Sequence, residues 1–231
     1  MKVMRLEEPR ALEHAIATLQ HGGTVAFPTD TVYGIGAAIN APSALARIYE
    51  AKGRDAERPL PVLLSSPSAM SVVSPGVDQR LHNLATHFWP GALTVAVPAL
   101  PNLPPQVVAP DGTVGVRVPD HSIALTLAQR SGGAIAVTSA NLSGDPPATH
   151  PGDIVPALAE RLDLVLDGGI ARLGTASTVI SLDGDRITIV REGAIPADDI
   201  LRVWAEIIAG SDPQPGDPIA PAGGVLDKAI P

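Results

Sequence analysis

Hydrophobic positions follow two patterns along the chain, and the first is typical of helices that bury one face. Apolar residues recur at three- and four-residue intervals, and Gly22-Gly23 follows the first such stretch as a C-terminal cap would. These stretches predict helices over residues 10–21, 42–51, 77–88, 122–129, 154–161 and 197–208. The second of them delivers Lys52-Gly53-Arg54 at its C-terminal end.

The second pattern is a short apolar run bounded by proline, glycine or polar residues, which is typical of strands. It predicts strands over residues 24–27, 60–64, 92–97, 114–118, 134–137, 164–166, 177–182 and 186–190. Pro61 favours an edge or first-residue position in its strand. Asp183-Gly184-Asp185 predicts a hairpin between the last two strands, because glycine supplies the positive φ that tight turns need.

Composition narrows the fold class. A chain of 231 residues with 45% hydrophobic residues can bury a sizeable core, and we expect one domain over residues 1–210. Aromatic residues make up only 3%, whereas there are 22 glycines and 24 prolines, so the core is built from Val, Leu, Ile and Ala with many sharp turns. This composition favours a mixed α/β fold. Residues 211–231 are rich in Pro and Gly without periodicity, which predicts a disordered tail.

Several classes of function are disfavoured. The absence of cysteine excludes disulfides, thiolate zinc sites and a cysteine nucleophile. The first residues lack the apolar stretch of a secretory signal, and no run is apolar enough to span a membrane, so we expect a cytoplasmic protein. A formal charge of -8 opposes nonspecific binding to nucleic acid, although it leaves a local basic cleft open.

Four polar clusters lie at the ends of predicted strands or helices, over residues 29–34, 52–58, 138–144 and 191–193. Taken singly, each has a structural explanation: a turn held by side-chain hydrogen bonds, a solvated charged loop, a capping loop and a surface arginine. Together, their arginines, lysine, hydroxyls and glycines suit a polyphosphate. The sequence contains neither of the two common glycine-rich nucleotide loops. The residues by themselves therefore predict an anion or nucleotide site in an α/β domain.

Seven segments, taken in order, carry a family resemblance. They are Phe27-Pro28-Thr29-Asp30-Thr31-Val32-Tyr33-Gly34-Ile35-Gly36, Lys52-Gly53-Arg54 with Arg58-Pro59-Leu60, Trp89-Pro90-Gly91 with Leu93-Thr94, Arg117-Val118-Pro119 with His121, Ser139-Ala140-Asn141-Leu142-Ser143-Gly144, Ser177-Thr178-Val179 and Arg191-Glu192-Gly193. In this order they resemble the motifs of the YrdC-like threonylcarbamoyl-AMP synthase family. The resemblance implies a twisted, mixed, mostly parallel sheet flanked by helices, with a large concave cavity in which ATP and L-threonine lie side by side.

The resemblance also implies the residues of each site. In the L-threonine pocket it places Thr31, Arg117, Val137 and Ser177. Around ATP it places Lys52, Arg54, Arg58, Thr113, Ser139, Asn141, Pro147 and Arg191. We expect Lys52, Arg54 and Arg58 to form the catalytic electrostatic clamp on phosphate, and Arg117 to pair with the threonine carboxylate.

The implied reaction joins L-threonine, bicarbonate and ATP to give threonylcarbamoyl-AMP and pyrophosphate. Mg²⁺ would be bridged by the ATP phosphates, with no metal held by the protein. This is the first step of threonylcarbamoyladenosine formation at A37 of tRNAs that read ANN codons. The product would pass to the tRNA threonylcarbamoyl-transfer machinery, and a weak contact with tRNA itself is left open.

Two departures from the family pattern affect these expectations. Some members carry Asn where Arg58 stands and His where Leu63 stands, and Leu63 cannot hydrogen-bond threonine. Longer members carry a linker and a second C-terminal domain, so we expect the short, single-domain form, with residues 211–231 either disordered or folded over the mouth of the cavity as the linker is in the longer members. Two other functions stay open: a carbamoyl-transfer module of hydrogenase maturation, which normally accompanies zinc-binding cysteines, and a non-enzymatic RNA-binding domain.

Overall fold

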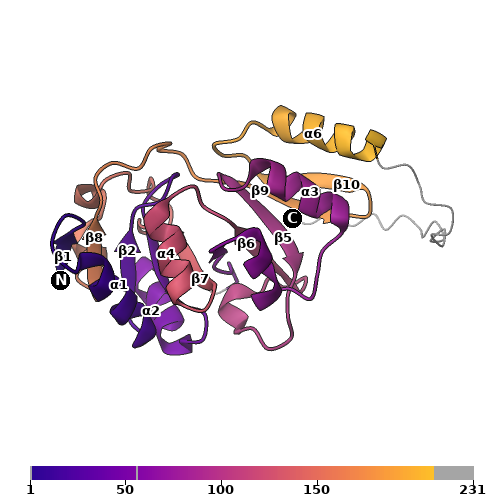
Figure 1. Cartoon of the computed structure of the whole chain (residues 1–231). Coiled ribbons are helices and arrows are strands. Elements are labelled where there is room, and N and C mark those ends of the chain that lie inside the picture. Colours follow the sequence, from indigo (N-terminus) through magenta and orange to yellow (C-terminus); the bar gives the residue numbers. More distant parts are fainter. Residues whose placement is uncertain (1, 56, 211–231) are drawn as a thin grey trace.

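A single ten-stranded sheet organises the molecule (Figure 1). The computed structural model describes residues 2–55 and 57–210. The strands follow the spatial order β1-β8-β2-β3-β7-β4-β6-β5-β9-β10. Their bounds are β1 Val3–Arg5, β2 Val25–Phe27, β3 Gly34–Ala38, β4 Val62–Leu64, β5 Leu93–Pro98, β6 Thr113–Arg117, β7 Ala134–Ser139, β8 Leu164–Asp167, β9 Thr178–Asp183 and β10 Arg186–Arg191.

The sheet is mixed, as expected, but it is less parallel than expected. The pairs β1–β8, β8–β2, β4–β6 and β5–β9 are parallel, whereas the other five neighbouring pairs in the described sheet are antiparallel. Strands that follow one another through a short connection can pair only in the antiparallel sense, since a parallel pair needs a long crossover. This applies to β2 and β3 and to the β9–β10 hairpin, which is confirmed with Gly184 at a φ of 56°.

Residues 2–55 and 57–210 form six α-helices, and their predicted positions are confirmed. They are α1 Ala11–Gln20, α2 Pro42–Lys52, α3 Gln79–Phe88, α4 Ser122–Arg130, α5 Pro156–Ala159 and α6 Ala197–Gly210. Helix α5 is shorter than predicted because Pro156 restricts the residue before it, and Val155 is extended with a ψ of 142°. Helices α1 and α4 contact one another and the β2–β7–β8 part of the sheet, whereas α3 and α6 pack together near β10 (Figure 1).

Both faces of the central sheet are buried. Ala26 and Phe27 are consecutive residues of β2, yet they belong to different core clusters. Ile135 and Ala136 of β7 are divided in the same way. Successive side chains of a strand point to opposite faces, so these strands are apolar throughout and show no alternation.

The sequence prediction missed two strands, β3 and β1. Strand β3 consists of glycine, isoleucine and alanine, a composition that does not favour a strand. Small residues are needed there, because a Cβ on Gly36 would lie 2.9 Å from the Phe27 ring. Strand β1 has only three residues. Strand β4 begins directly after Pro61 and lies between β7 and β6, so of the two positions predicted for this proline the start of a strand agrees with the structure and the edge does not.

Two further predictions concern the chain as a whole. The predicted disordered tail over residues 211–231 lies outside the described residues. Within residues 2–55 and 57–210, no helix is long and apolar enough to cross a membrane.

Candidate functional site

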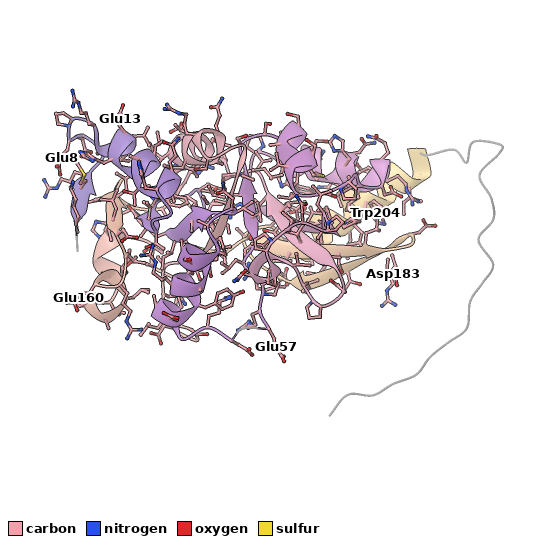
Figure 2. All side chains as sticks on the ribbon, turned by 90° about the horizontal axis from the view of Figure 1, so that it is seen from below. Glu8, Glu13, Glu57, Glu160, Asp183 and Trp204 are labelled. Carbon is pink, nitrogen blue, oxygen red and sulfur yellow. The ribbon has the colours of Figure 1, made fainter. Side chains whose placement is uncertain are left out.

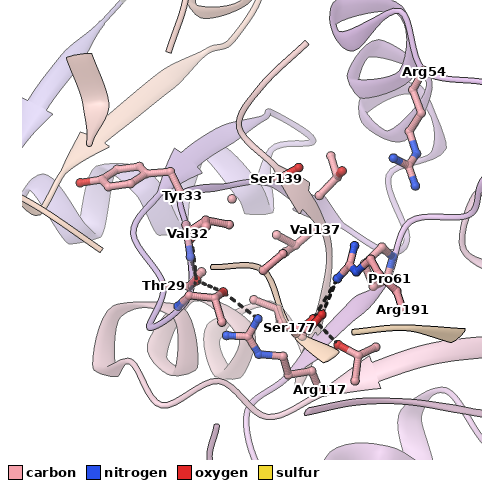
Figure 3. A pocket seen from close by; sticks show the side chains of 16 residues that line it. Thr29, Val32, Tyr33, Arg54, Pro61, Arg117, Val137, Ser139, Ser177 and Arg191 are labelled. Atoms are coloured by element: carbon pink, nitrogen blue, oxygen red, sulfur yellow. Dashed lines mark hydrogen bonds between the residues drawn. The ribbon is translucent and has the colours of Figure 1, made fainter. Parts of the chain in front are cut away.

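Residues of all four predicted polar clusters line one pocket of about 150 Å³ (Figure 3). The loop after β2, the ends of β4, β6 and β7, and the segments around β9 and β10 form its wall. The lining residues are Thr29, Thr31, Val32, Tyr33, Gly34, Arg54, Pro61, Leu63, Thr94, Arg117, Val137, Thr138, Ser139, Ala176, Ser177 and Arg191. Typical sites for larger ligands have about 300–1,000 Å³. The pocket is therefore smaller than the large cavity that the sequence led us to expect, and its size suits a small ligand.

All four residues predicted for the threonine pocket line this wall: Thr31, Arg117, Val137 and Ser177. Of the residues predicted around ATP, Arg54, Ser139 and Arg191 also line it. Lys52, Arg58, Thr113, Asn141 and Pro147 are not part of the described wall. Figure 3 shows Arg54 and Arg117 on opposite sides of the pocket, with Arg191 nearer to Ser177.

Arg117 is held by residues of two other motifs that are far from it in the sequence. Its Nε donates to the carbonyl oxygen of Gly91 at 2.9 Å, and its Nη1 donates to Thr31 Oγ1 at 2.9 Å. Its Nη2 donates to Asp30 Oδ1. A guanidinium has five N–H groups, so two of them are left for a ligand.

Asp30 neutralises Arg117 in the interior. The side chains of Arg117 and Asp30 are 7% and 0% exposed. Burial lowers the pKa of Arg117, and the neighbouring Asp30 carboxylate opposes this effect. Asp30 Oδ2 has no hydrogen-bond partner among the described residues. The sequence prediction quoted Asp30 within its motif but assigned no role to it, since a fully buried ion pair cannot be read from residue order.

The loop after β2 forms a turn held by Thr29, which confirms the structural explanation given for this cluster. Pro28 ends the strand, and Thr29 Oγ1 then accepts from the amides of Thr31 and Val32 at 3.2 and 3.3 Å. The same oxygen donates to the carbonyl of Val32 at 2.7 Å and lies 2.9 Å from Thr31 Oγ1. Because both threonines also line the pocket, the turn is at once a structural element and part of the site.

Ser177 connects the start of β9 to the end of β10. Its carbonyl accepts from Arg191 Nη2 at 2.6 Å, and its hydroxyl lies 2.8 Å from Thr94 Oγ1. Gly193 makes this approach possible, since a Cβ there would lie 2.2 Å from the carbonyl oxygen of Ala176. Thr94 had been noted only as part of a motif, and its place in the pocket follows from the parallel pairing of β5 with β9.

Arg54 projects from the end of α2, which stops at Gly53 in the left-handed region with a φ of 58°. Its Nε and Nη2 donate to the carbonyls of Arg58 and Pro59 at 2.9 and 3.0 Å. Burial is the main cause of a lowered pKa at Arg54, and the nearby charges of Arg58 and Arg191 act in the same direction. Three cations therefore lie close enough to influence one another.

Lys52 faces the loop after β7 instead of the pocket. Its Nζ donates to the carbonyl of Ser139 at 2.5 Å, to the carbonyl of Asn141, and to Asn141 Oδ1 at 3.4 Å. These acceptors use all three of its N–H donors. Its own carbonyl accepts from the amide of Ser143 at 3.0 Å. Burial, assisted by Arg54, lowers the pKa of Lys52 to about 8. In this conformation Lys52 organises the loop that carries Ser139 and Asn141.

Thr113 and Asn141, which were predicted for the ATP site, make hydrogen bonds within their own segments. Thr113 begins β6, and its hydroxyl donates to Asp111 at 2.7 Å. The side-chain amide of Asn141 donates to the carbonyls of Leu142 and Asp145, which folds its loop on itself. Leu63, noted as a departure from the family pattern, is 5% exposed and lines the pocket with Val137, so this side of the wall is apolar.

The charge of the pocket is opposite to that of the molecule. Its wall holds Arg54, Arg117 and Arg191 and no carboxylate among the residues that the structure describes. The acidic side chains of Glu8, Glu13, Glu160 and Asp183 are exposed on the periphery (Figure 2). A protein with a formal charge of -8 thus keeps a local site for anions, as the sequence had left open.

Comparison with known proteins identifies the family of the chain. The family model Sua5/YciO/YrdC, described as "Telomere recombination", matches residues 17–193. The chain belongs to this Sua5/YciO/YrdC family. A family member from Bacillus subtilis named threonylcarbamoyl-AMP synthase is 39% identical over 213 residues, which are 91% of this chain and 62% of the relative. A putative threonylcarbamoyl-AMP synthase from Mycobacterium tuberculosis (strain H37Rv) is 34% identical over 85% of this chain and 90% of its own length.

A solved structure of the Sua5/YciO/YrdC family has the same fold as this chain. Sua5 of Pyrococcus abyssi, complexed with L-threonine, superposes with a TM-score of 0.81 at 35% identity. The superposition covers 87% of this chain and 60% of the Pyrococcus protein. The chain therefore spans about three fifths of the length of the Bacillus and Pyrococcus relatives.

Proposed function

We propose that this chain is a threonylcarbamoyl-AMP synthase, which converts L-threonine, bicarbonate and ATP to threonylcarbamoyl-AMP and pyrophosphate. The observation that carries the proposal is one pocket in which Arg117 keeps two N–H groups for a carboxylate while Arg54 and Arg191 supply positive charge. The names of the relatives support the same activity, and the Pyrococcus structure contains the proposed amino acid.

The amino-acid end of the pocket lies at Arg117. A carboxylate can accept from the N–H that is left on Nη1 or on Nη2 of Arg117, which gives a charge-assisted hydrogen bond. Thr31 and Ser177 add hydroxyl groups to the same wall, and Val137 and Leu63 would face the side chain of the substrate. The volume of about 150 Å³ fits this smaller substrate better than a nucleotide.

The nucleotide end lies toward Arg54 and Arg191. We assign the phosphates to Arg54, Arg58 and Arg191, because these cations lie near one another without carboxylate partners in the pocket wall. Lys52, Thr113, Ser139, Asn141 and Pro147 complete the proposed ATP site, with Lys52 acting through the loop that it holds. A wall without carboxylates suits Mg²⁺ held by the ATP phosphates, where it would neutralise phosphate charge.

The chemistry needs no protein nucleophile. The amine of threonine attacks the carbon of bicarbonate, and loss of water leaves N-carboxythreonine. An oxygen of its new carboxylate then attacks the α-phosphorus of ATP, the bond from this phosphorus to the bridging oxygen breaks, and pyrophosphate leaves. Arg117 orients one reactant, and Arg54, Arg58 and Arg191 stabilise charge on the other.

The product is a reactive mixed anhydride, so a second reaction must transfer its threonylcarbamoyl group to an acceptor. We propose that it is the first intermediate of threonylcarbamoyladenosine formation at A37 of tRNAs reading ANN codons, in the cytoplasm. The tRNA threonylcarbamoyl-transfer machinery would receive it, and any contact of this chain with tRNA would be weak given its charge of -8.

The test is pyrophosphate release by purified protein with ATP, Mg²⁺ and bicarbonate, with and without L-threonine. We expect release that depends on threonine and falls by about 100-fold or more in Arg54→Ala, because that variant loses phosphate stabilisation in the transition state. Arg202→Ala is the matched control, since Arg202 is 62% exposed and pairs only with residues of its own helix in the described structure. Absence of threonine-dependent release from the wild type would refute the proposed function.

A further inference from the structure

The shortest contact of the Thr29 hydroxyl, which is to a carbonyl oxygen, sets the direction of its other hydrogen bonds. A threonine hydroxyl has one proton to donate. Thr29 Oγ1 gives its proton to the carbonyl oxygen of Val32, at 2.7 Å. With that proton on the Val32 carbonyl, Thr31 is the donor and Thr29 the acceptor in the 2.9 Å contact between the two hydroxyls. Thr29 Oγ1 then shares its two lone pairs between this contact and the longer ones from the amides of Thr31 and Val32, at 3.2 and 3.3 Å.

With this assignment, Thr31 can accept one hydrogen bond from a ligand. Its proton points to Thr29, and one lone pair of its oxygen accepts from Arg117 Nη1 at 2.9 Å. A hydroxyl oxygen has two lone pairs, so one stays available. Thr31 lines the pocket and therefore offers a ligand an acceptor, beside the donors of Arg117.

We propose that Thr29 is a positioning residue for the amino-acid substrate. Because Thr29 Oγ1 accepts the hydroxyl proton of Thr31, this proton points away from the pocket. Thr31 then accepts a hydrogen bond from the ammonium or the hydroxyl group of L-threonine. The proposal rests on the proposed function, because it concerns the same substrate. Thr29 acts through Thr31, so its effect on threonine binding disappears when the hydroxyl of Thr31 is removed.

A purely structural role for Thr29 makes a different prediction. Thr29 Oγ1 also accepts from the amides of Thr31 and Val32, at 3.2 and 3.3 Å. These bonds hold the turn whether or not residue 31 has a hydroxyl. If they were the whole role of Thr29, its loss would weaken threonine binding equally in both backgrounds.

A double-mutant cycle separates the two roles. Calorimetric Kd values for L-threonine are measured with wild type, Thr29→Val, Thr31→Val and the double variant, with Thr29→Ser as the conservative control. We expect Thr29→Val to weaken binding about tenfold, the size of one hydrogen bond, with Thr29→Ser close to wild type. In the Thr31→Val background, Thr29→Val should have no further effect. The Kd for ATP and the unfolding temperature report on the integrity of the fold in each variant.

L-2-Aminobutyrate, which lacks the hydroxyl group of threonine, identifies the donor. If Thr31 accepts from the ammonium, Thr29→Val weakens the binding of both amino acids by the same factor. If Thr31 accepts from the hydroxyl, only threonine binding is weakened. Either result supports the acceptor assignment.

Two results would overturn the inference, and they differ in meaning. If wild type binds threonine but Thr29→Val is equally damaging in both backgrounds, or harmless in both, the assignment of Thr29 is wrong and the proposed function stands. If wild type binds no L-threonine, the proposed function fails and this assignment fails with it.

Discussion

The buried pair of Asp30 and Arg117 provides a test of the whole site description, because its energetic signature differs from that of a surface ion pair. Asp30→Ala removes the carboxylate and leaves the guanidinium of Arg117 unpaired in the interior. The side chains of Arg117 and Asp30 are 7% and 0% exposed, so water cannot replace the lost partner. Breaking such a pair from one side costs about 3–5 kcal/mol of unfolding free energy.

The double variant Asp30→Ala/Arg117→Leu removes both charges. Replacing both partners of a buried pair with apolar groups is often nearly neutral for stability. We therefore expect the double variant to be more stable than Asp30→Ala alone. It should nevertheless fail to bind L-threonine, because the proposed carboxylate donor is gone.

Equilibrium unfolding in urea measures this difference. With a slope of about 2 kcal/mol per molar urea, a loss of 3–5 kcal/mol moves the midpoint by roughly 2 M. Asp120→Ala is the control, since Asp120 and Arg172 form a pair whose side chains are 49% and 64% exposed. An exposed pair contributes only about 0–1 kcal/mol. A midpoint for Asp30→Ala as high as that of Asp120→Ala, or a double variant no more stable than the single one, would refute the reasoning.

Three other perturbations test separate parts of the site. Lys52 has a pKa of about 8 in the fold against an ordinary value of 10.5, so the unfolded chain binds more protons between these values and stability should rise with pH there. The urea midpoint of the wild type should therefore be higher at pH about 10 than at pH about 8, whereas that of Lys52→Met should not rise. If the midpoint changes with pH to the same extent in both proteins, the burial of the Lys52 ammonium is contradicted. Gly193→Ala should destabilise the fold by about 1–3 kcal/mol and weaken threonine binding, because the new Cβ meets the carbonyl of Ala176 at 2.2 Å. Gly210→Ala, where a Cβ meets nothing within 4 Å, should change neither, and thermal unfolding with calorimetry compares the two variants. Leu63→Ala should reduce the preference for threonine over serine by about tenfold, because it opens the apolar wall that would face the substrate methyl group. Competition between the two amino acids in the pyrophosphate assay measures this ratio, and an unchanged preference would remove Leu63 from the side-chain pocket.

Much of the fold could be predicted from the sequence, because apolar spacing and turn residues act locally. Helix α2 ends beside Gly53, and Gly184 closes the β9–β10 hairpin, as the residue types required. The order of the motifs also indicated which residues share a site, and Thr31, Arg117, Val137 and Ser177 do line one pocket. Strand β3 escaped prediction, because its glycines are selected by the close approach of Phe27 and Val137 and not by strand propensity.

The chemical state of the site was decided only by the tertiary structure. Residue order identified Lys52 as a cation near phosphate, but the fold turns its ammonium to the carbonyls of Ser139 and Asn141. Residue order also gave Asp30 no role, whereas the pairing of strands brings it against Arg117 and buries both charges. The sequence by itself determined which side chains are available, since periodicity and turn chemistry depend on near neighbours. Which proton, charge or lone pair each side chain presents depends on partners distant in the chain, and these meet only when the sheet is assembled.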